Sequence, residues 1–322
     1  MEEVKSEKCF SRMLLLLIKV VNSLIIPFDI KALLVIGLEY VSAGLHRILQ
    51  KKEEKETHSS SAEEPIRKTA VMLDGTSKHG VILRKKLAEE GYSVIYPDEN
   101  GISEENMINI PIKIRNEASI NLFVKKISLY GRIDLLVLNS AKRSISTQVK
   151  IRPIKGLEKK IIPSKDKKGF ISKNELYKEK NRVLLEKDSN AKKNYLFNFL
   201  LIRGLAEKLK AGDGVVVLCI DRIFMIADKA PSMLPSYFFS YCHSQLLALF
   251  LGIGTKSRYT YLDVRIVGSC FLTDQWTSAA IGSIRQKRSE SVQYFNGSTE
   301  EKIDESYTDR ANDLWENAEM VS

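Results

Sequence analysis

Residues 68–100 read KTAVMLDGTSKHGVILRKKLAEEGYSVIYPDEN, and this stretch decides the fold. A short apolar run at 69–73 precedes Asp74-Gly75, a pattern typical of a strand followed by a turn. From Val81 onward apolar residues stand among charged ones as in an amphipathic helix, and Gly91 is placed to end that helix. Residues 92–96 then form the next predicted strand, so the stretch predicts a strand–turn–helix–strand unit.

The rest of the chain repeats this alternation of strands and helices. The run GVVVLCI at 214–220 is continuous and rich in β-branched residues, which is typical of a parallel strand covered on both faces. Other predicted strands lie at 110–114, 135–138 and 261–267, and predicted helices lie at 116–130, 191–210 and 237–253. We therefore expect an α/β protein with a Rossmann-like doubly wound parallel sheet, an N-terminal apolar helical segment and a basic insertion.

Residues 68–274 resemble the short-chain dehydrogenase/reductase superfamily. That family opens with Thr-Gly-x-x-x-Gly-x-Gly; here Gly80 matches the last glycine, and Gly75 lies one place after the first. The segment YGRIDLLVLNSAK at 130–142 resembles the family's Gly-x-Ile-Asp-x-Leu-Val-x-Asn-Ala-Gly strand, with Asn139 as the matching asparagine. The resemblance implies a nicotinamide cofactor, NAD(H) or NADP(H), near Gly75, Gly80 and Asn139.

The glycine pattern of the cofactor turn is incomplete. Asp74 and Lys78 stand at the first and middle glycine positions, where the backbone must approach a pyrophosphate with no side chain between. A bulky side chain or a negative charge there indicates lost or altered binding. Asp98, just past the second strand, matches the residue that reads the adenosine ribose and favours NAD over NADP. The alternative for Asp98 is a turn residue that follows proline.

The catalytic residues that the resemblance implies are also incomplete. The family carries Tyr-x-x-x-Lys on one helix, and this chain has Tyr241-Cys-His-Ser-Gln245, with the two end residues on one helical face. Gln245 is neutral and cannot promote ionisation of the tyrosine as a lysine does. The family's serine after the strand at 214–220 is replaced by Ile220-Asp221. Tyr241 and Asn194 are the candidate catalytic residues, with a packed aromatic and a surface helix residue as the alternatives.

Residues 1–50 carry two apolar blocks, at 13–28 and 33–49. Lys19 interrupts the first block and Glu39 the second, so neither reaches the roughly 20 apolar residues that a bilayer-spanning helix needs. No small-residue cleavage site follows the first block, which argues against a signal peptide. Two interpretations remain: a membrane-embedded or monotopic helical hairpin, or helices packed on the protein or on a partner.

A basic insertion spans residues 142–190 and holds the charge of the whole chain. Residues 142–187 contain fifteen Lys or Arg against five Asp or Glu, a net charge of +10 that equals the formal charge of all 322 residues. Such a segment suits anionic lipid head groups. Nucleic acid is not favoured, because Phe170 and Tyr177 are the segment's only aromatic residues and no binding motif is present. The alternative is a solvated insertion without a partner.

Cysteine and histidine usage excludes two classes of protein. Four cysteines have no paired spacing and four histidines are dispersed, so neither a metal site nor a disulfide framework is predicted. A hydrophobic fraction of 44% is that of a globular protein. We expect residues 1–50 to be membrane-associated helices, 51–66 a polar linker, 67–275 the Rossmann-like domain and 276–322 a C-terminal extension.

These features predict a membrane-associated protein with a degenerate active site, acting as a non-catalytic scaffold or binding protein. The alternative is a divergent NAD(P)-dependent oxidoreductase with a lipid or acyl carbonyl or hydroxyl substrate. Expected partners are a membrane surface, through residues 10–50 and 142–187, and a second copy or another protein, through the helices at 191–210 and 237–253. The expected location is the cytosolic face of the endoplasmic reticulum or of the mitochondrial outer membrane.

Overall fold

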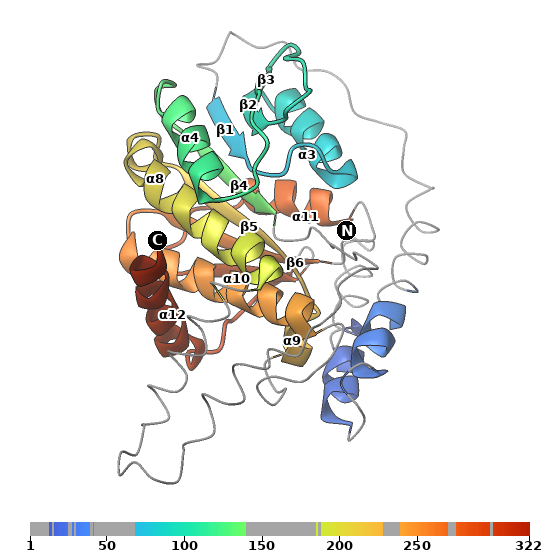
Figure 1. The fold of residues 1–322 in the computed structure, drawn as a ribbon. Coiled ribbons are helices and arrows are strands. Elements are labelled where there is room, and N and C mark those ends of the chain that lie inside the picture. Colours follow the sequence, from blue (N-terminus) through green and yellow to red (C-terminus); the bar gives the residue numbers. More distant parts are fainter. Residues whose placement is uncertain are drawn as a thin grey trace, which may run out of the picture.

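The computed structural model describes residues 13–14, 16–24, 28, 30–38, 41, 68–139, 185, 188–227, 239–269, 275–296 and 299–322. The predictions for the polar linker at 51–66 and for the basic residues 142–184 lie outside this part of the chain. The described residues build one sheet with helices on both of its faces (Figure 1).

The sheet has eight strands in the order β3-β2-β1-β4-β5-β6-β7-β8. All neighbouring pairs are parallel except β7 and β8, which are antiparallel. The strands are β1 (Lys68–Met72), β2 (Tyr92–Pro97), β3 (Met107–Ile110), β4 (Leu135–Asn139), β5 (Val215–Asp221), β6 (Asp263–Ser269), β7 (Gln293–Asn296) and β8 (Thr299–Glu301). The chain reverses its direction of winding between β3 and β4, as in a doubly wound sheet. The predicted fold class is confirmed.

Helices cover the sheet in two layers. The helices described from residue 78 onward are α3 (Lys78–Glu89), α4 (Glu117–Ile127), α7 (Ser189–Ala191), the π-helical turn η1 (Lys192–Leu196), α8 (Phe197–Ala211), α9 (Phe224–Ala227), α10 (Phe239–Arg258), α11 (Gln275–Ile284) and α12 (Tyr307–Val321). The buried side chains of α4, α8 and α10 join the hydrophobic core on one face of the sheet. Those of α3 and α11 join a separate core on the other face.

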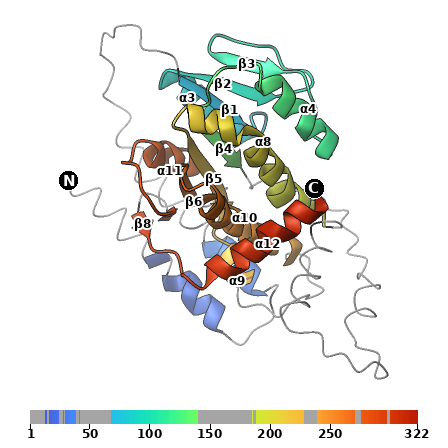
Figure 2. The ribbon, with the colours of Figure 1, turned by 90° about the vertical axis from the view of Figure 1, so that its left-hand side faces the viewer.

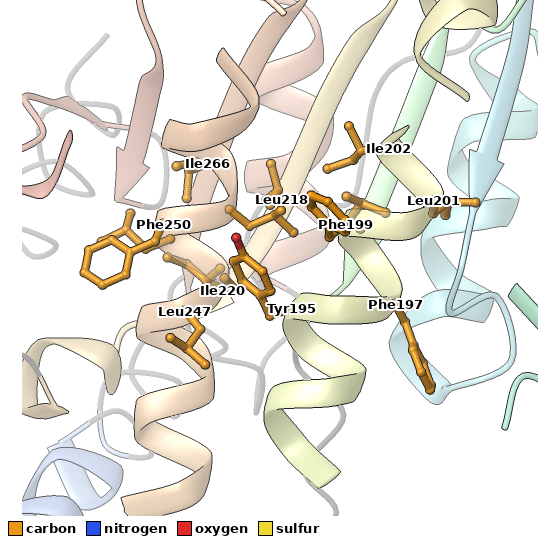
Figure 3. Close-up of a cluster of buried hydrophobic side chains, with 14 of the residues drawn as sticks. Tyr195, Phe197, Phe199, Leu201, Ile202, Leu218, Ile220, Leu247, Phe250 and Ile266 are labelled. Carbon is orange, nitrogen blue, oxygen red and sulfur yellow. The ribbon is translucent and has the colours of Figure 1, made fainter. Parts of the chain in front are cut away.

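Strand β5 shows why its sequence has no polar alternation. Leu218 and Ile220 belong to the core on the α8–α10 face, and Val217 and Cys219 belong to the core on the α3–α11 face. Both faces of this parallel strand are buried, so positions 215–220 are all apolar and only the last residue, Asp221, is polar. Figure 3 shows the first of these cores, in which strand residues such as Leu218 and Ile266 meet side chains of α8 and α10.

Two boundaries differ from the sequence prediction. The third strand is Met107–Ile110 rather than 110–114, because Pro111 has no N–H to donate to a neighbouring strand. The sheet also does not end at residue 275, since β7 pairs with β6 and β8 pairs with β7. Strands β7 and β8 therefore belong to the same sheet, and α12 belongs to the same core, so these elements do not form a separate extension.

Helix α12 covers α10 on the side away from the sheet (Figure 2). Trp315 is 1% exposed, and its ring lies 4.8 Å from that of Phe199 in an edge-on arrangement. A Cβ atom at Gly254 would come within 3.1 Å of the Trp315 ring, so this glycine lets the two helices approach. The apolar face of α10 that prompted the prediction of a contact with another chain is buried within this chain, and the dimer stays a prediction.

The N-terminal helical residues pack on the core with one face only. Leu14 and Ile18, from the first stretch, and Ala32 and Val35, from the second, belong to the core on the α8–α10 face. The Asn22 side-chain amide donates to the Met225 carbonyl in α9 at 2.8 Å. No helix among the described residues is both long and apolar enough to cross a bilayer.

Replacing Trp315 with Ala should destabilise the fold by about 3–5 kcal/mol, because it removes a fully buried aromatic from the α10–α12 contact. The free energy of unfolding from urea titration measures this. Met320→Ala is the matched control on the same helix, since Met320 is 69% exposed, and we expect a change within about 0.5 kcal/mol. Equal, small effects of both substitutions would contradict this packing.

Candidate functional site

Polar side chains gather at two places where parallel strands end. The first, which we call the turn cluster, follows β1 and contains Asp74, Ser77, Gly80 and Asn139. The second, which we call the Tyr241 network, lies at the end of β5 and contains Asn194, Asp221, Tyr241, Ser244 and Gln245. Ligands of open α/β sheets bind outside the carboxyl ends of the strands, so these are the candidate sites.

The polar groups of the turn cluster form hydrogen bonds with one another. The Asp74 carboxylate accepts the Ser77 N–H at 3.2 Å through one oxygen and the Asn139 side-chain amide at 3.3 Å through the other. The Ser77 hydroxyl accepts the Gly80 N–H at 3.0 Å and so caps α3. A negative charge from the chain itself thus lies at the N-terminus of α3, where helix-end N–H groups attract anions.

The two glycines that matched the family's motif fill internal steric roles. A Cβ atom on Gly75 would lie 2.6 Å from the Cβ of Tyr96, and one on Gly80 would lie 2.1 Å from the Asp74 carbonyl oxygen. Tyr96 is buried, with the Arg84 guanidinium 4.3 Å from its ring centre. Burial raises the pKa of the Tyr96 hydroxyl above its ordinary value, although Arg84 acts in the opposite direction.

Asp98 lies at the carboxyl end of β2, as the resemblance implied, and bonds within its own loop. Its carboxylate accepts the Asn100 N–H at 3.2 Å, an arrangement typical of an Asx turn. A Cβ atom on Gly101 would lie 2.7 Å from the same carboxylate, so the loop folds tightly around it. The alternative of a turn residue accounts for these contacts without a ribose.

The described residues of the turn cluster do not fit a pyrophosphate. A phosphate at this turn needs uncommitted N–H donors and glycines that leave room for it. Here the Ser77 and Gly80 N–H groups bond to side chains of the cluster, and both glycines accommodate the chain's own atoms. The Asp74 carboxylate would also repel the phosphates, because like charges at this distance cost free energy.

The Tyr241 network joins α10 to the end of β5 through a single residue. The Tyr241 hydroxyl donates to the Asp221 carboxylate at 3.0 Å, and the Asp221 N–H donates to the Gln245 side-chain oxygen at 2.9 Å. The second carboxylate oxygen accepts the Ile223 N–H at 3.1 Å, which turns the chain into α9. Positions 241 and 245 lie one helical turn apart, so both reach Asp221.

Gln245 suits this network in a way that the family's lysine does not. It is 0% exposed and acts as an acceptor for a main-chain N–H. A lysine ammonium has three donors and no acceptor, so it cannot make this bond. Gln245 therefore bonds to the main chain of residue 221, whereas Tyr241 bonds to its side chain.

Asn194, the member of the network that comes from η1, is buried, so it is not a surface helix residue. Its side-chain amide donates to the Ser244 hydroxyl at 2.8 Å, and that hydroxyl donates to the Tyr241 carbonyl at 2.7 Å. Asn194 lies on the π-helical turn η1, where the wider helix leaves main-chain carbonyls available to other donors. The Asn194 main-chain carbonyl accepts the Asn198 side-chain amide at 3.0 Å. The structure thus brings the two predicted catalytic residues together, joined through Ser244.

Other reactive side chains of this region do not form a site. Burial raises the pKa of the Cys219 thiol to about 12, so it stays protonated and is a poor nucleophile at neutral pH. Among the described residues no group of His, Cys, Asp and Glu could hold a metal ion. A shallow groove lined by residues that include Lys86, Glu90 and Arg285 lies at the C-terminal end of α3, at the opposite edge of the sheet.

Five members of these clusters were not candidate site residues from the sequence: Asp74, Ser77, Asp221, Ser244 and Gln245. A signal for Asp221 was present, because it follows a buried parallel strand directly. Ser77 stands three residues before Gly80 at the start of a helix, which is a capping pattern. Ser244 is one of several helix serines, and only its contact with Asn194, 50 residues away, distinguishes it.

A comparison with one solved structure gives the same fold, and two further solved structures match with lower TM-scores. An oxidoreductase assigned as a short-chain alcohol dehydrogenase from Burkholderia multivorans matches with a TM-score of 0.51 and 14% identity, over 74% of this chain and 100% of that one. A short-chain dehydrogenase/reductase from Brucella ovis in complex with a partially ordered NAD matches at 0.44, with 14% identity, 71% of this chain and 99% of that one. An alcohol dehydrogenase from Thermococcus sibiricus complexed with 5-hydroxy-NADP matches at 0.47, with 14% identity, 74% of this chain and 100% of that one.

No protein-family model matches the sequence, and no curated protein matches it with significance. Sequence identities this low support the fold alone. The cofactor and the activity must be inferred from the residues of this chain.

Replacing Gln245 with Leu should destabilise the protein by about 1–3 kcal/mol, because the Asp221 N–H loses its buried acceptor. Tyr241→Phe should cost about 1 kcal/mol, since it removes one hydrogen bond to a carboxylate. Urea unfolding measures both values. Ser257→Ala, at an exposed position of the same helix, is the control, and an effect of Gln245→Leu no larger than this control would disprove the network.

Proposed function

We propose that this chain, which has the fold of the short-chain dehydrogenases/reductases, is a non-catalytic binding protein that works at a membrane surface without a nicotinamide cofactor. The observation that carries the proposal is a pair of hydrogen bonds at Asp221. The Tyr241 hydroxyl donates to the Asp221 carboxylate, and the Asp221 N–H donates to the Gln245 side-chain oxygen. These side chains stand where the family has its proton donor and its lysine, and here they support the fold.

The chemistry of the Tyr241 network supports this proposal. A proton donor must point its hydroxyl at a substrate and must tolerate a phenolate after the transfer. The Tyr241 hydroxyl already donates to Asp221, and a phenolate there would face a carboxylate at hydrogen-bond distance. Gln245 is neutral and bonded to the main chain, so it does not compensate that charge.

The turn cluster gives independent support. Asp74 places a carboxylate where a pyrophosphate would lie, and Ser77 caps the helix that would bind it. The two clusters follow different strands, and both differ from the family in the same way. In each, a side chain that would contact a ligand in the family contacts another part of this chain. A scaffold needs neither ligand.

One observation favours a second candidate, a divergent oxidoreductase acting on a lipid or acyl carbonyl or hydroxyl group. Tyr241 is half-buried while its neighbours Cys242 and Ser244 are buried, and its hydroxyl lies beside a carboxylate that could take up a proton. Such an enzyme needs a bound NAD(H) or NADP(H) as the source or acceptor of hydride. Cofactor binding therefore separates the two candidates.

Titration of the full chain with NADH and with NADPH, up to about 1 mM, should give no saturable change in ligand fluorescence and no shift in the thermal midpoint. A ligand at 100 times its Kd would stabilise the folded state by about 2.7 kcal/mol, which a thermal shift detects readily.

Saturable binding of either cofactor would refute the scaffold and favour the oxidoreductase. In that case Tyr241→Phe is the next variant. Loss of carbonyl reduction with unchanged cofactor affinity would assign Tyr241 as the proton donor.

A further inference from the structure

The N-terminal helical residues expose far more apolar surface than the rest of the described chain. Thirteen large hydrophobic residues among the described ones are exposed, and nine of these lie between residues 13 and 41. The nine are Met13, Leu16, Leu17, Val20, Leu24, Ile30, Leu33, Leu34 and Val41. Contiguous apolar patches on a protein surface mark contact sites for a partner or a membrane.

The nine residues form two stripes, which we call the N-terminal apolar stripes. In the first stretch they occupy positions 13, 16, 17, 20 and 24, and in the second 30, 33, 34 and 41, which is the spacing of one helical face. Leu14, Ile18, Ala32 and Val35 lie on other faces and pack into the core. Each helix therefore has one apolar face on the protein and another directed away from it.

Two hydrogen bonds fix the orientation of the stripes. Asn22 holds the first helix to α9 through the Met225 carbonyl, and the Lys31 ammonium donates to the Asn22 carbonyl at 2.9 Å. Figures 1 and 2 show the pair of helices beside α9 at one end of the molecule. Because this pair is attached to the core by its inner face, only the outer face is available to a partner.

We propose that the N-terminal apolar stripes dock this protein on an anionic lipid surface, with both helices lying in the plane of the bilayer interface. Helices of this type bury one face at the boundary between head groups and acyl chains. No described helix is long and apolar enough to cross a bilayer, which agrees with a docking mode that needs no span. The inference concerns a surface remote from the Tyr241 network and holds whether or not that network is catalytic.

The charge of the chain favours a lipid surface, rather than a second copy of this chain, as the partner of the N-terminal apolar stripes. The chain carries a formal net charge of +10. Two copies joined through their stripes would each carry this positive charge and would repel each other. Anionic head groups attract that charge, at short range and in a salt-dependent manner.

Vesicle flotation with the full chain tests the proposal. The protein should float with vesicles of phosphatidylcholine and phosphatidylserine, float much less with phosphatidylcholine alone, and lose binding at about 1 M salt. Leu16→Glu/Leu33→Glu adds a charge to each stripe and should lower the bound fraction at least about tenfold. Ile102→Glu/Leu129→Glu is the matched control, since both residues are exposed, lie outside the stripes and receive the same charges.

A second pair on the same stripes, Val20→Glu/Leu34→Glu, should act like the first, and unchanged thermal midpoints show that each variant is folded. Flotation of the stripe variants equal to that of the control pair would overturn the proposal. So would a wild-type chain that stays unbound with anionic vesicles. A wild-type dimer that the stripe variants convert to a monomer would assign the stripes to a second copy instead.

Discussion

Asp221 ends strand β5 in the middle of the sheet, and α10 is held to it at two points. One is the Tyr241 hydroxyl on the carboxylate, and the other is the Gln245 side-chain oxygen on the main-chain N–H. Because α10 is in turn the helix on which α7, α9 and α12 pack, the position of these two bonds sets much of one face of the molecule. These two hydrogen bonds join side chains that are close in space but 20 and 24 positions away from Asp221 in the sequence.

The turn cluster follows the same physical logic at the other end of the candidate site. A buried polar group needs a partner, and where a ligand does not supply it the chain must. The side chains of Asp74 and Ser77 accept hydrogen bonds from N–H groups that could otherwise bind an anion. The space beside Gly75 is filled by Tyr96, and the space beside Gly80 is filled by the Asp74 carbonyl, rather than by a phosphate. Both glycines thus leave room for atoms of the chain itself.

The fold was predictable because it depends on periodic apolar sequence. The β-branched run at 214–220 is typical of a strand buried on both faces, and the structure places β5 there. The hydrogen bond between the Asp221 N–H and Gln245 was not predictable, since the fold brings into contact two residues that lie 24 positions apart. Asn194 and Tyr241 were found through resemblance, but their connection through Ser244 was not. The covering of α10 by α12 was missed, and Trp315 stands in a segment rich in acidic residues.

Amide hydrogen exchange at Asp221 tests the central claim most directly. If Gln245 accepts this N–H in a buried site, the Asp221 amide should exchange only through global unfolding, at the rate of the most protected β5 amides. Gln245→Leu should speed exchange at Asp221 more than at Leu218, whose amide lies within the β5 strand. Rapid exchange at Asp221 in the wild-type chain, or a rate that Gln245→Leu leaves unchanged, would contradict the account.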